Sequence, residues 1–129
     1  MILDTSAIAA ILFGELEATR YTQIIHDADR CLISAASFVE LAIVIEGQIG
    51  PDAGRQCDVF LRRAGIVIEP VTVEQAHLAR QAFPDFGKGR HAAGLNFGDC
   101  FAYALAKISG EPLLFKGQDF SKTDVKAAA

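Results

Sequence analysis

Short apolar runs alternate along the chain with longer segments of helical periodicity. Four runs are short enough to be buried strands: Met1–Leu3, Cys31–Ile33, Ile66–Ile68 and Pro112–Phe115. The segments between them are predicted to be helices at residues 7–13, 16–28, 36–46, 51–63, 72–83 and 96–109, with a glycine-rich loop over 84–96. Strands that alternate with helices indicate a mostly parallel sheet of four or five strands, with helices on both faces.

The segment 36–46 fits two structures. Its run Ile43–Ile45 favours a strand by propensity. Its length, a capping serine at Ser34 and a stop at Gly47 favour a helix, which is our prediction. This helix is apolar nearly all round, so we expect it to be buried on more than one side or to form an oligomer face.

Caps and turn residues mark the other helix ends. Thr5 and Ser6 offer a cap for the first helix, which is expected to end at Gly14. The sequence Thr72–Gln75 has the pattern of a capping box, and Asn96 opens the last helix.

Composition indicates one globular domain over residues 1–129. Apolar residues make up 51% of the chain and charged residues 22%. No basic leader precedes the first apolar run, and no stretch reaches the roughly 18 apolar residues that span a bilayer. We therefore expect a soluble cytoplasmic protein without membrane contact, and its three cysteines fit a core role as free thiols.

Charge is unevenly distributed along the chain. The net charge of −4 argues against binding of nucleic acid by bulk positive charge. Residues 1–79 carry a net −6, whereas residues 80–129 carry a net +2. If a nucleic acid binds, its phosphates are expected at the second half, where Lys88, Arg90 and Lys116 are candidate contacts.

Four acidic residues stand out by position: Asp4, Glu40, Asp99 and Asp119. Asp4 ends the first predicted strand and Asp119 follows the fourth, and ligands of open parallel sheets bind beyond the carboxyl ends of the strands. Helix starts can bring Glu40 and Asp99 to the same edge. Converging carboxylates repel one another, and Mg²⁺ or Mn²⁺ with oxygen ligands removes that repulsion.

Each acid also has an ordinary structural explanation. Asp4 could cap the following helix, and Glu40 could be a surface residue. Asp99 stands three residues after Asn96, the position of a capping-box carboxylate. Asp119 could be a turn residue. Spacing alone does not decide between these roles and a shared site.

Four motifs resemble those of the PIN-domain family, and most of all those of VapC toxins, the ribonuclease half of type II toxin–antitoxin pairs. They are MILDTSA at 1–7, SAASFVEL at 34–41, NFGDCFAYALAK at 96–107 and LLFKGQDF at 113–120. The resemblance runs from Met1 to about Val125, and the four motifs in this order are specific.

The resemblance implies an α/β/α sandwich and a homodimer. It also implies an Mg²⁺- or Mn²⁺-dependent endoribonuclease that cuts RNA with a metal-activated water. The family's acidic residues map onto Asp4, Glu40, Asp99 and Asp119, and Ser6 contributes a hydroxyl near the metal. The implied partner is a VapB antitoxin, through which the toxin contacts operator DNA only indirectly.

One departure concerns the last motif. Many PIN domains read Asp-x-Asp-Phe there, whereas this chain has Gly117 at the first of these positions and keeps Asp119. The last motif therefore offers one carboxylate fewer as a ligand for a second metal ion. The alternatives to a toxin are a PIN nuclease of RNA processing without an antitoxin and a catalytically silent PIN-like module that binds nucleic acid or protein.

Overall fold

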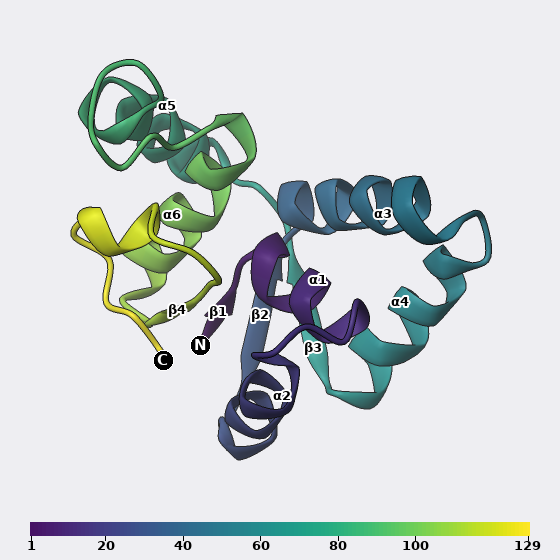
Figure 1. Cartoon of the computed structure of the whole chain (residues 1–129). Coiled ribbons are helices and arrows are strands. Elements are labelled where there is room, and N and C mark those ends of the chain that lie inside the picture. Colours follow the sequence, from purple (N-terminus) through teal and green to yellow (C-terminus); the bar gives the residue numbers. More distant parts are fainter.

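The computed structural model describes residues 1–129 and is built around one parallel sheet (Figure 1). Its strands are β1 (Ile2–Leu3), β2 (Cys31–Ser34), β3 (Ile66–Glu69) and β4 (Leu113–Leu114). They lie in the order β3-β2-β1-β4, and every pairing is parallel. The four predicted strands are therefore confirmed.

Successive strand residues point to opposite faces of the sheet. Leu3, Ile33 and Leu114 pack into one hydrophobic core, together with Ile66 of the edge strand. Ile2, Leu32 and Leu113 pack into a second core on the other face. Burial on both faces explains why β1, β2 and β4 are continuous apolar runs rather than alternating patterns. In the edge strand β3, by contrast, Val67 and Ile68 are exposed.

Helices cover both faces, which confirms the predicted α/β/α sandwich. The first core takes side chains of α1 (Thr5–Leu12), α2 (Ala18–Asp27), α3 (Ala35–Ile49) and α4 (Ala53–Arg63). The second core takes side chains of α5 (Val73–Phe86) and α6 (Phe97–Ser109), and of the short 3₁₀ helix η1 (Phe120–Lys122). No helix combines the length and the apolar character that crossing a membrane requires.

Three predicted helix boundaries are wrong. Helix α1 ends at Leu12 rather than at Gly14, and Asp4, the alternative cap, rather than Thr5 or Ser6, caps it with its side chain. Helix α3 passes through Gly47 and ends at Gly50, where φ is 116°. Helix α5 continues through Pro84 to Phe86, so the loop predicted from residue 84 begins only at Gly87.

Helix α3 is buried on one side only. Leu41 and Ile45 lie in the first core, and Ser34 caps the helix as predicted, accepting a hydrogen bond from the Ala36 amide at 3.2 Å. Val39 and Ile43 remain 55% and 67% exposed. The helix thus retains an outward apolar face of the kind that suits an oligomer contact.

Candidate active site

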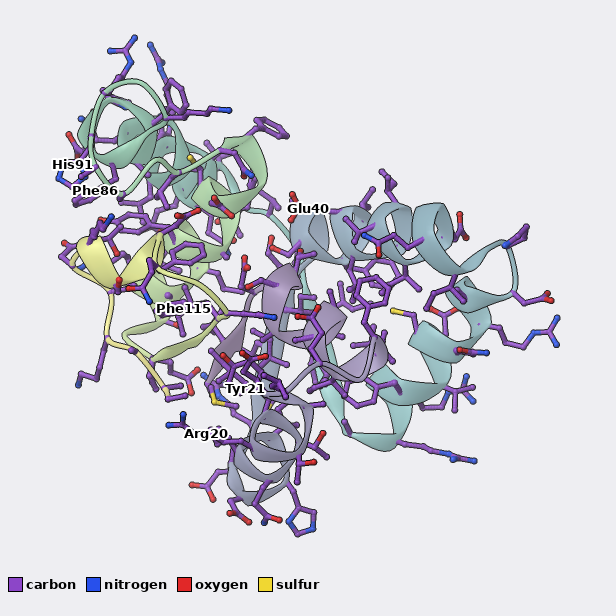
Figure 2. All side chains as sticks on the ribbon, viewed as in Figure 1. Arg20, Tyr21, Glu40, Phe86, His91 and Phe115 are labelled. Carbon is purple, nitrogen blue, oxygen red and sulfur yellow. The ribbon has the colours of Figure 1, made fainter.

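The four predicted carboxylates lie around the carboxyl edge of the sheet. Asp4 directly follows β1, and Asp119 follows β4 by way of a short loop. Glu40 lies in the helix that leaves β2. Helix α6 precedes β4 and runs back along the sheet, so its first turn, which carries Asp99, lies at the same edge. Figure 2 shows Glu40 at the end of α3 nearest to α6.

Asp4 is both a helix cap and a buried carboxylate. Its Oδ2 accepts hydrogen bonds from the Ser6 amide at 3.0 Å and from Ser6 Oγ at 2.6 Å. Its Oδ1 is buried and has no hydrogen-bond partner. Burial raises the pKa of Asp4 above its usual value, against the hydrogen bonds from Ser6, and the charge of Glu40 raises it further.

Ser6 connects this carboxylate to the loop that follows β4. While Ser6 Oγ donates to Asp4, it accepts a hydrogen bond from the Lys116 amide at 3.0 Å. The serine hydroxyl therefore has a fixed direction. This fits its predicted place beside the acidic residues.

Asp99 forms the capping box that its distance from Asn96 suggested. The Asp99 amide donates to Asn96 Oδ1 at 2.9 Å, and Asp99 Oδ2 accepts from the Asn96 amide at 3.0 Å. The pKa of Asp99 is nevertheless raised to about 7, chiefly by burial. The charges of Asp4, Glu40 and Asp119 raise it further. Capping and membership of the acidic group therefore coexist.

Glu40 reaches the site because Gly98 has no side chain. A Cβ atom on Gly98 would collide with the carboxylate of Glu40. Glycine in a helix interior normally costs stability relative to alanine, so its place in the first turn of α6 needs a reason. The close approach of Glu40 supplies that reason. Sequence reasoning missed Gly98, although a glycine between Phe97 and Asp99 was a visible signal.

Asp119 is the most exposed member of the group. It precedes η1 and makes no side-chain cap. In this conformation no three His, Cys, Asp or Glu side chains lie close enough together to coordinate one ion. What the four acids share is an electrostatic field, because Asp4, Glu40 and Asp119 all act on Asp99.

The three basic candidates differ from one another. The Lys116 ammonium pairs with Glu15 and, at 3.3 Å, with Glu17, so its charge is already neutralised. Lys88 and Arg90 are exposed in the loop after α5. Arg90 lies over the ring of Phe83, with 5.6 Å between the guanidinium carbon and the ring centroid. Only Lys88 and Arg90 thus keep a charge that a phosphate could use.

Sequence comparison finds relatives along the whole chain. The model of the PIN domain matches residues 1–126. VapC ribonuclease Mb0640 of Mycobacterium bovis is 49% identical over 129 residues, which are 100% of this chain and 98% of the relative.

Solved structures share the fold at low sequence identity. Mycobacterium tuberculosis VapC20, described as a Sarcin-Ricin loop cleaving toxin, has a TM-score of 0.78 at 18% identity, covering 96% of this chain and 95% of that chain. VapBC2 of Rickettsia felis, bound to a DNA fragment from its promoter, has a TM-score of 0.73 at 12% identity, covering 98% and 94%. With its motifs, its sheet order and its acidic edge, the chain belongs to the PIN-domain family, among relatives named VapC ribonucleases.

Proposed function

We propose that this protein is a divalent-metal-dependent endoribonuclease and the toxin of a type II toxin–antitoxin pair. The observation that carries the proposal is the group of four carboxylates at the sheet edge, none of which takes part in an ion pair. Burial raises the pKa of Asp4 and of Asp99, and the charges of the neighbouring acids raise both further. Titratable groups perturbed in this way are typical of functional sites. A silent binding module has no evident need for four such charges.

The donor atoms fit a hard divalent cation such as Mg²⁺ or Mn²⁺. All of them are carboxylate oxygens, the ligands that these ions prefer. The buried Asp4 Oδ1 lacks any partner, which is costly unless something binds it. Asp4, Asp99 and Asp119 would hold the ion, with Glu40 as a ligand or as the group that orients water. When bound, the ion would lower the pKa of an attacking water and neutralise charge on the scissile phosphate.

The remaining roles belong to groups around the carboxylates. Ser6 holds Asp4 in one orientation through its two hydrogen bonds to Oδ2. Asn96 does the same for Asp99. Lys88 and Arg90 would bind RNA phosphates without reading sequence. The side chain of Lys116, held by Glu15 and Glu17, would not.

The partners follow from the family and from one surface. The VapC names of the relatives support a VapB-type antitoxin, and the Rickettsia felis VapBC2 complex with promoter DNA supports binding of operator DNA by the pair. We expect the antitoxin, rather than this chain, to contact that DNA. RNA is the substrate, and its unpaired regions are the expected target. The exposed apolar residues Val39 and Ile43 on α3 support a homodimer.

Purified protein and total RNA test the activity. We expect cleavage with Mn²⁺ or Mg²⁺, none with EDTA, and none by an Asp4→Asn variant that unfolds at the same temperature as the wild type. Co-purification with the product of an adjacent small reading frame should suppress cleavage. Cleavage that survives both EDTA and Asp4→Asn would refute the metal-dependent mechanism. An absence of cleavage at every metal concentration would favour a binding module.

A further inference from the structure

The ammonium of Lys116 is bound by two glutamates of the connection between α1 and α2. Lys116 lies in the loop that follows β4 and leads to Asp119. Its Nζ pairs with Glu15 and, at 3.3 Å, with Glu17, both of which come just before α2. About a hundred residues of sequence separate these partners. The two ion pairs therefore fasten the loop after β4 to the segment that enters α2.

These ion pairs are partly shielded from water. The side chains of Lys116, Glu15 and Glu17 are each about a third exposed. Glu17 Oε2 is buried and makes no hydrogen bond, so the ammonium of Lys116 is its only cationic partner. Loss of this ammonium would leave a buried carboxylate oxygen without compensation, which costs more than the loss of a fully exposed pair.

The main chain next to this ammonium is held at two further points. The Tyr21 hydroxyl of α2 donates a hydrogen bond to the Phe115 carbonyl at 3.0 Å (Figure 2). The Lys116 amide donates to Ser6 Oγ, also at 3.0 Å. Loops are normally the most mobile parts of a fold, so this many anchors on two successive loop residues need a reason.

The amide of Lys116 determines how Ser6 meets Asp4. A serine hydroxyl can rotate to suit its partners, so its direction depends on the bonds that it accepts. Because Ser6 Oγ accepts from the Lys116 amide, its hydrogen is left for Asp4 Oδ2, 2.6 Å away. The Ser6 amide donates to the same oxygen at 3.0 Å. Both bonds thus go to Oδ2, and the buried Oδ1 stays available to a ligand.

We propose that Lys116 is a positioning residue of the metal site, which holds the Asp4 carboxylate in its ligating orientation by way of Ser6. This inference rests on the metal-dependent function proposed above. Glu15 and Glu17 keep residue 116 in place through its ammonium. The amide of the same residue fixes the Ser6 hydroxyl, which in turn fixes Asp4. The lysine acts here as an anchor, so an ammonium that is already neutralised still contributes to the site.

Mn²⁺ binding to the RNA-free protein, measured by titration calorimetry, separates anchoring from charge. Lys116→Met removes a positive charge near the carboxylates, so electrostatics alone predicts tighter Mn²⁺ binding. Anchoring predicts the opposite, a dissociation constant raised roughly tenfold, at the lower end of the range for groups that orient metal ligands. The double variant Glu15→Gln with Glu17→Gln should raise it similarly. Lys116→Arg, which keeps the pairing charge, should bind Mn²⁺ nearly as the wild type does.

Two further variants test the route through the serine. Lys107→Met is the matched control, because Lys107 pairs with Asp124 at 3.1 Å, is similarly exposed, and lies at the end of α6 away from Asp99. Its Mn²⁺ affinity should equal that of the wild type. Ser6→Ala should weaken Mn²⁺ binding by itself. Lys116→Met added to Ser6→Ala should weaken it no further, because the two residues act along one chain of contacts.

Three results would overturn the proposal. They are Mn²⁺ binding by Lys116→Met that is unchanged or tighter, an equal loss of affinity in Lys107→Met, and a further loss when Lys116→Met is added to Ser6→Ala. Thermal unfolding in EDTA shows which variants are folded. If Lys116→Met is not, the glutamine double variant decides, and wild-type affinity there refutes anchoring. The proposed function fails differently, because a wild-type protein that binds no Mn²⁺ refutes the metal site itself and this inference with it.

Discussion

Gly98 of α6 lies directly against the carboxylate of Glu40 from α3, so close that a methyl group at Gly98 would displace it. We expect Gly98→Ala to push Glu40 out of the acidic group and to slow RNA cleavage at least tenfold, the usual scale for disturbed neighbours of a metal site. The free energy of unfolding should not fall, because alanine favours a helix by up to about 1 kcal/mol over glycine. Cleavage kinetics and urea unfolding measure the two effects.

Gly47→Ala is the matched control for this variant. Gly47 also lies within a helix, but a Cβ atom there would meet nothing within 4 Å. Gly47→Ala should raise the free energy of unfolding by up to about 1 kcal/mol, because alanine favours a helix over glycine. It should cleave RNA at the wild-type rate. If Gly98→Ala also cleaves normally, Glu40 has no part in the reaction.

The acidic group should make the metal-free protein less stable as the pH rises. The pKa of Asp99 is 3.8 in an unfolded chain and about 7 in the folded protein. The folded state therefore binds the proton more tightly, and this contribution is lost as the pH rises from about 4 to about 7. The raised pKa of Asp4 acts in the same direction.

Urea unfolding in EDTA over this pH range measures the effect. Asp99→Asn, which cannot ionise, should show a smaller decline, and Mn²⁺ should stabilise the wild type most at the upper end of the range. Parallel curves for the two proteins would mean that Asp99 titrates normally and is not coupled to the other acids.

The loop after α5 should contribute charge to RNA binding. Reversal of Lys88 and Arg90 to glutamate should weaken binding similarly for all RNA sequences and reduce the salt slope by about 1 per lost phosphate contact. The double variant Arg55→Glu with Arg62→Glu, two exposed residues of α4 in the other helical layer, controls for the same change in net charge. A slope that stays at the wild-type value would place the RNA elsewhere.

Self-association should depend on the outer face of α3. Ile43 is 67% exposed in the isolated chain, and Ile43→Asp should shift sedimentation from dimer towards monomer. Leu16, which is fully exposed just before α2, offers the comparison. If Leu16→Asp dissociates the protein and Ile43→Asp does not, the interface lies at α2. A wild-type protein that is already monomeric would exclude a homodimer through either helix.

Local signals were sufficient to predict the parallel sheet and the position of the four acids at its carboxyl edge. Two-sided burial leaves continuous apolar runs, and Asn96 with Asp99 marks a helix start in any context. The wrong predictions, such as the end of α3 at Gly47 and the role of Lys116, concern features that depend on contacts between segments far apart in the sequence. Gly47 lies inside α3 two residues after Ile45, which is buried in the first core. Glu15 and Glu17 neutralise Lys116 across about a hundred residues of sequence. No periodicity reveals such pairs.

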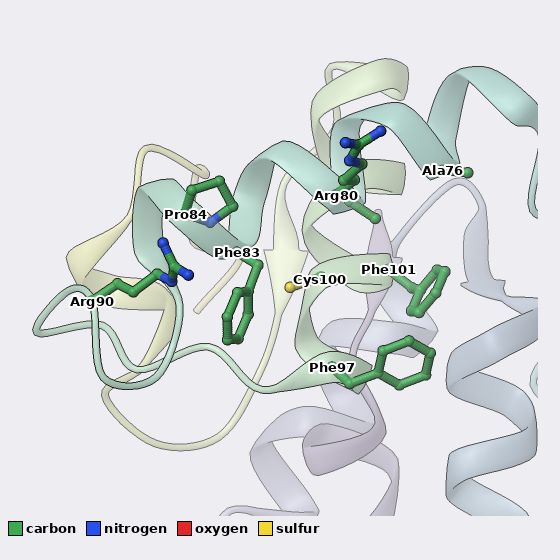
Figure 3. A pocket seen from close by; sticks show the side chains of 9 residues that line it. Ala76, Arg80, Phe83, Pro84, Arg90, Phe97, Cys100 and Phe101 are labelled. Carbon is green, nitrogen blue, oxygen red and sulfur yellow. The ribbon is translucent and has the colours of Figure 1, made fainter.

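An apolar groove between α5 and the first turns of α6 (Figure 3) escaped prediction for a related reason. Phe83, Phe97 and Arg80 belong to two helices, and each reads as an ordinary helical residue in its own segment. Only the packing of α5 on α6 gathers them. The same holds for Gly98. Its lack of a side chain matters only because Glu40, from another helix, packs against it.

The most direct test of the acidic metal site is the rate of RNA cleavage as a function of Mn²⁺ concentration, for the wild type and for Asp99→Asn. The substitution keeps the size of the side chain and its hydrogen bond to the Asn96 amide while removing the charge. The wild-type rate should rise from zero in EDTA to saturation, whereas Asp99→Asn should stay near zero at the same concentrations with its fold intact. Identical curves, or a wild type that cleaves equally well in EDTA, would contradict the account.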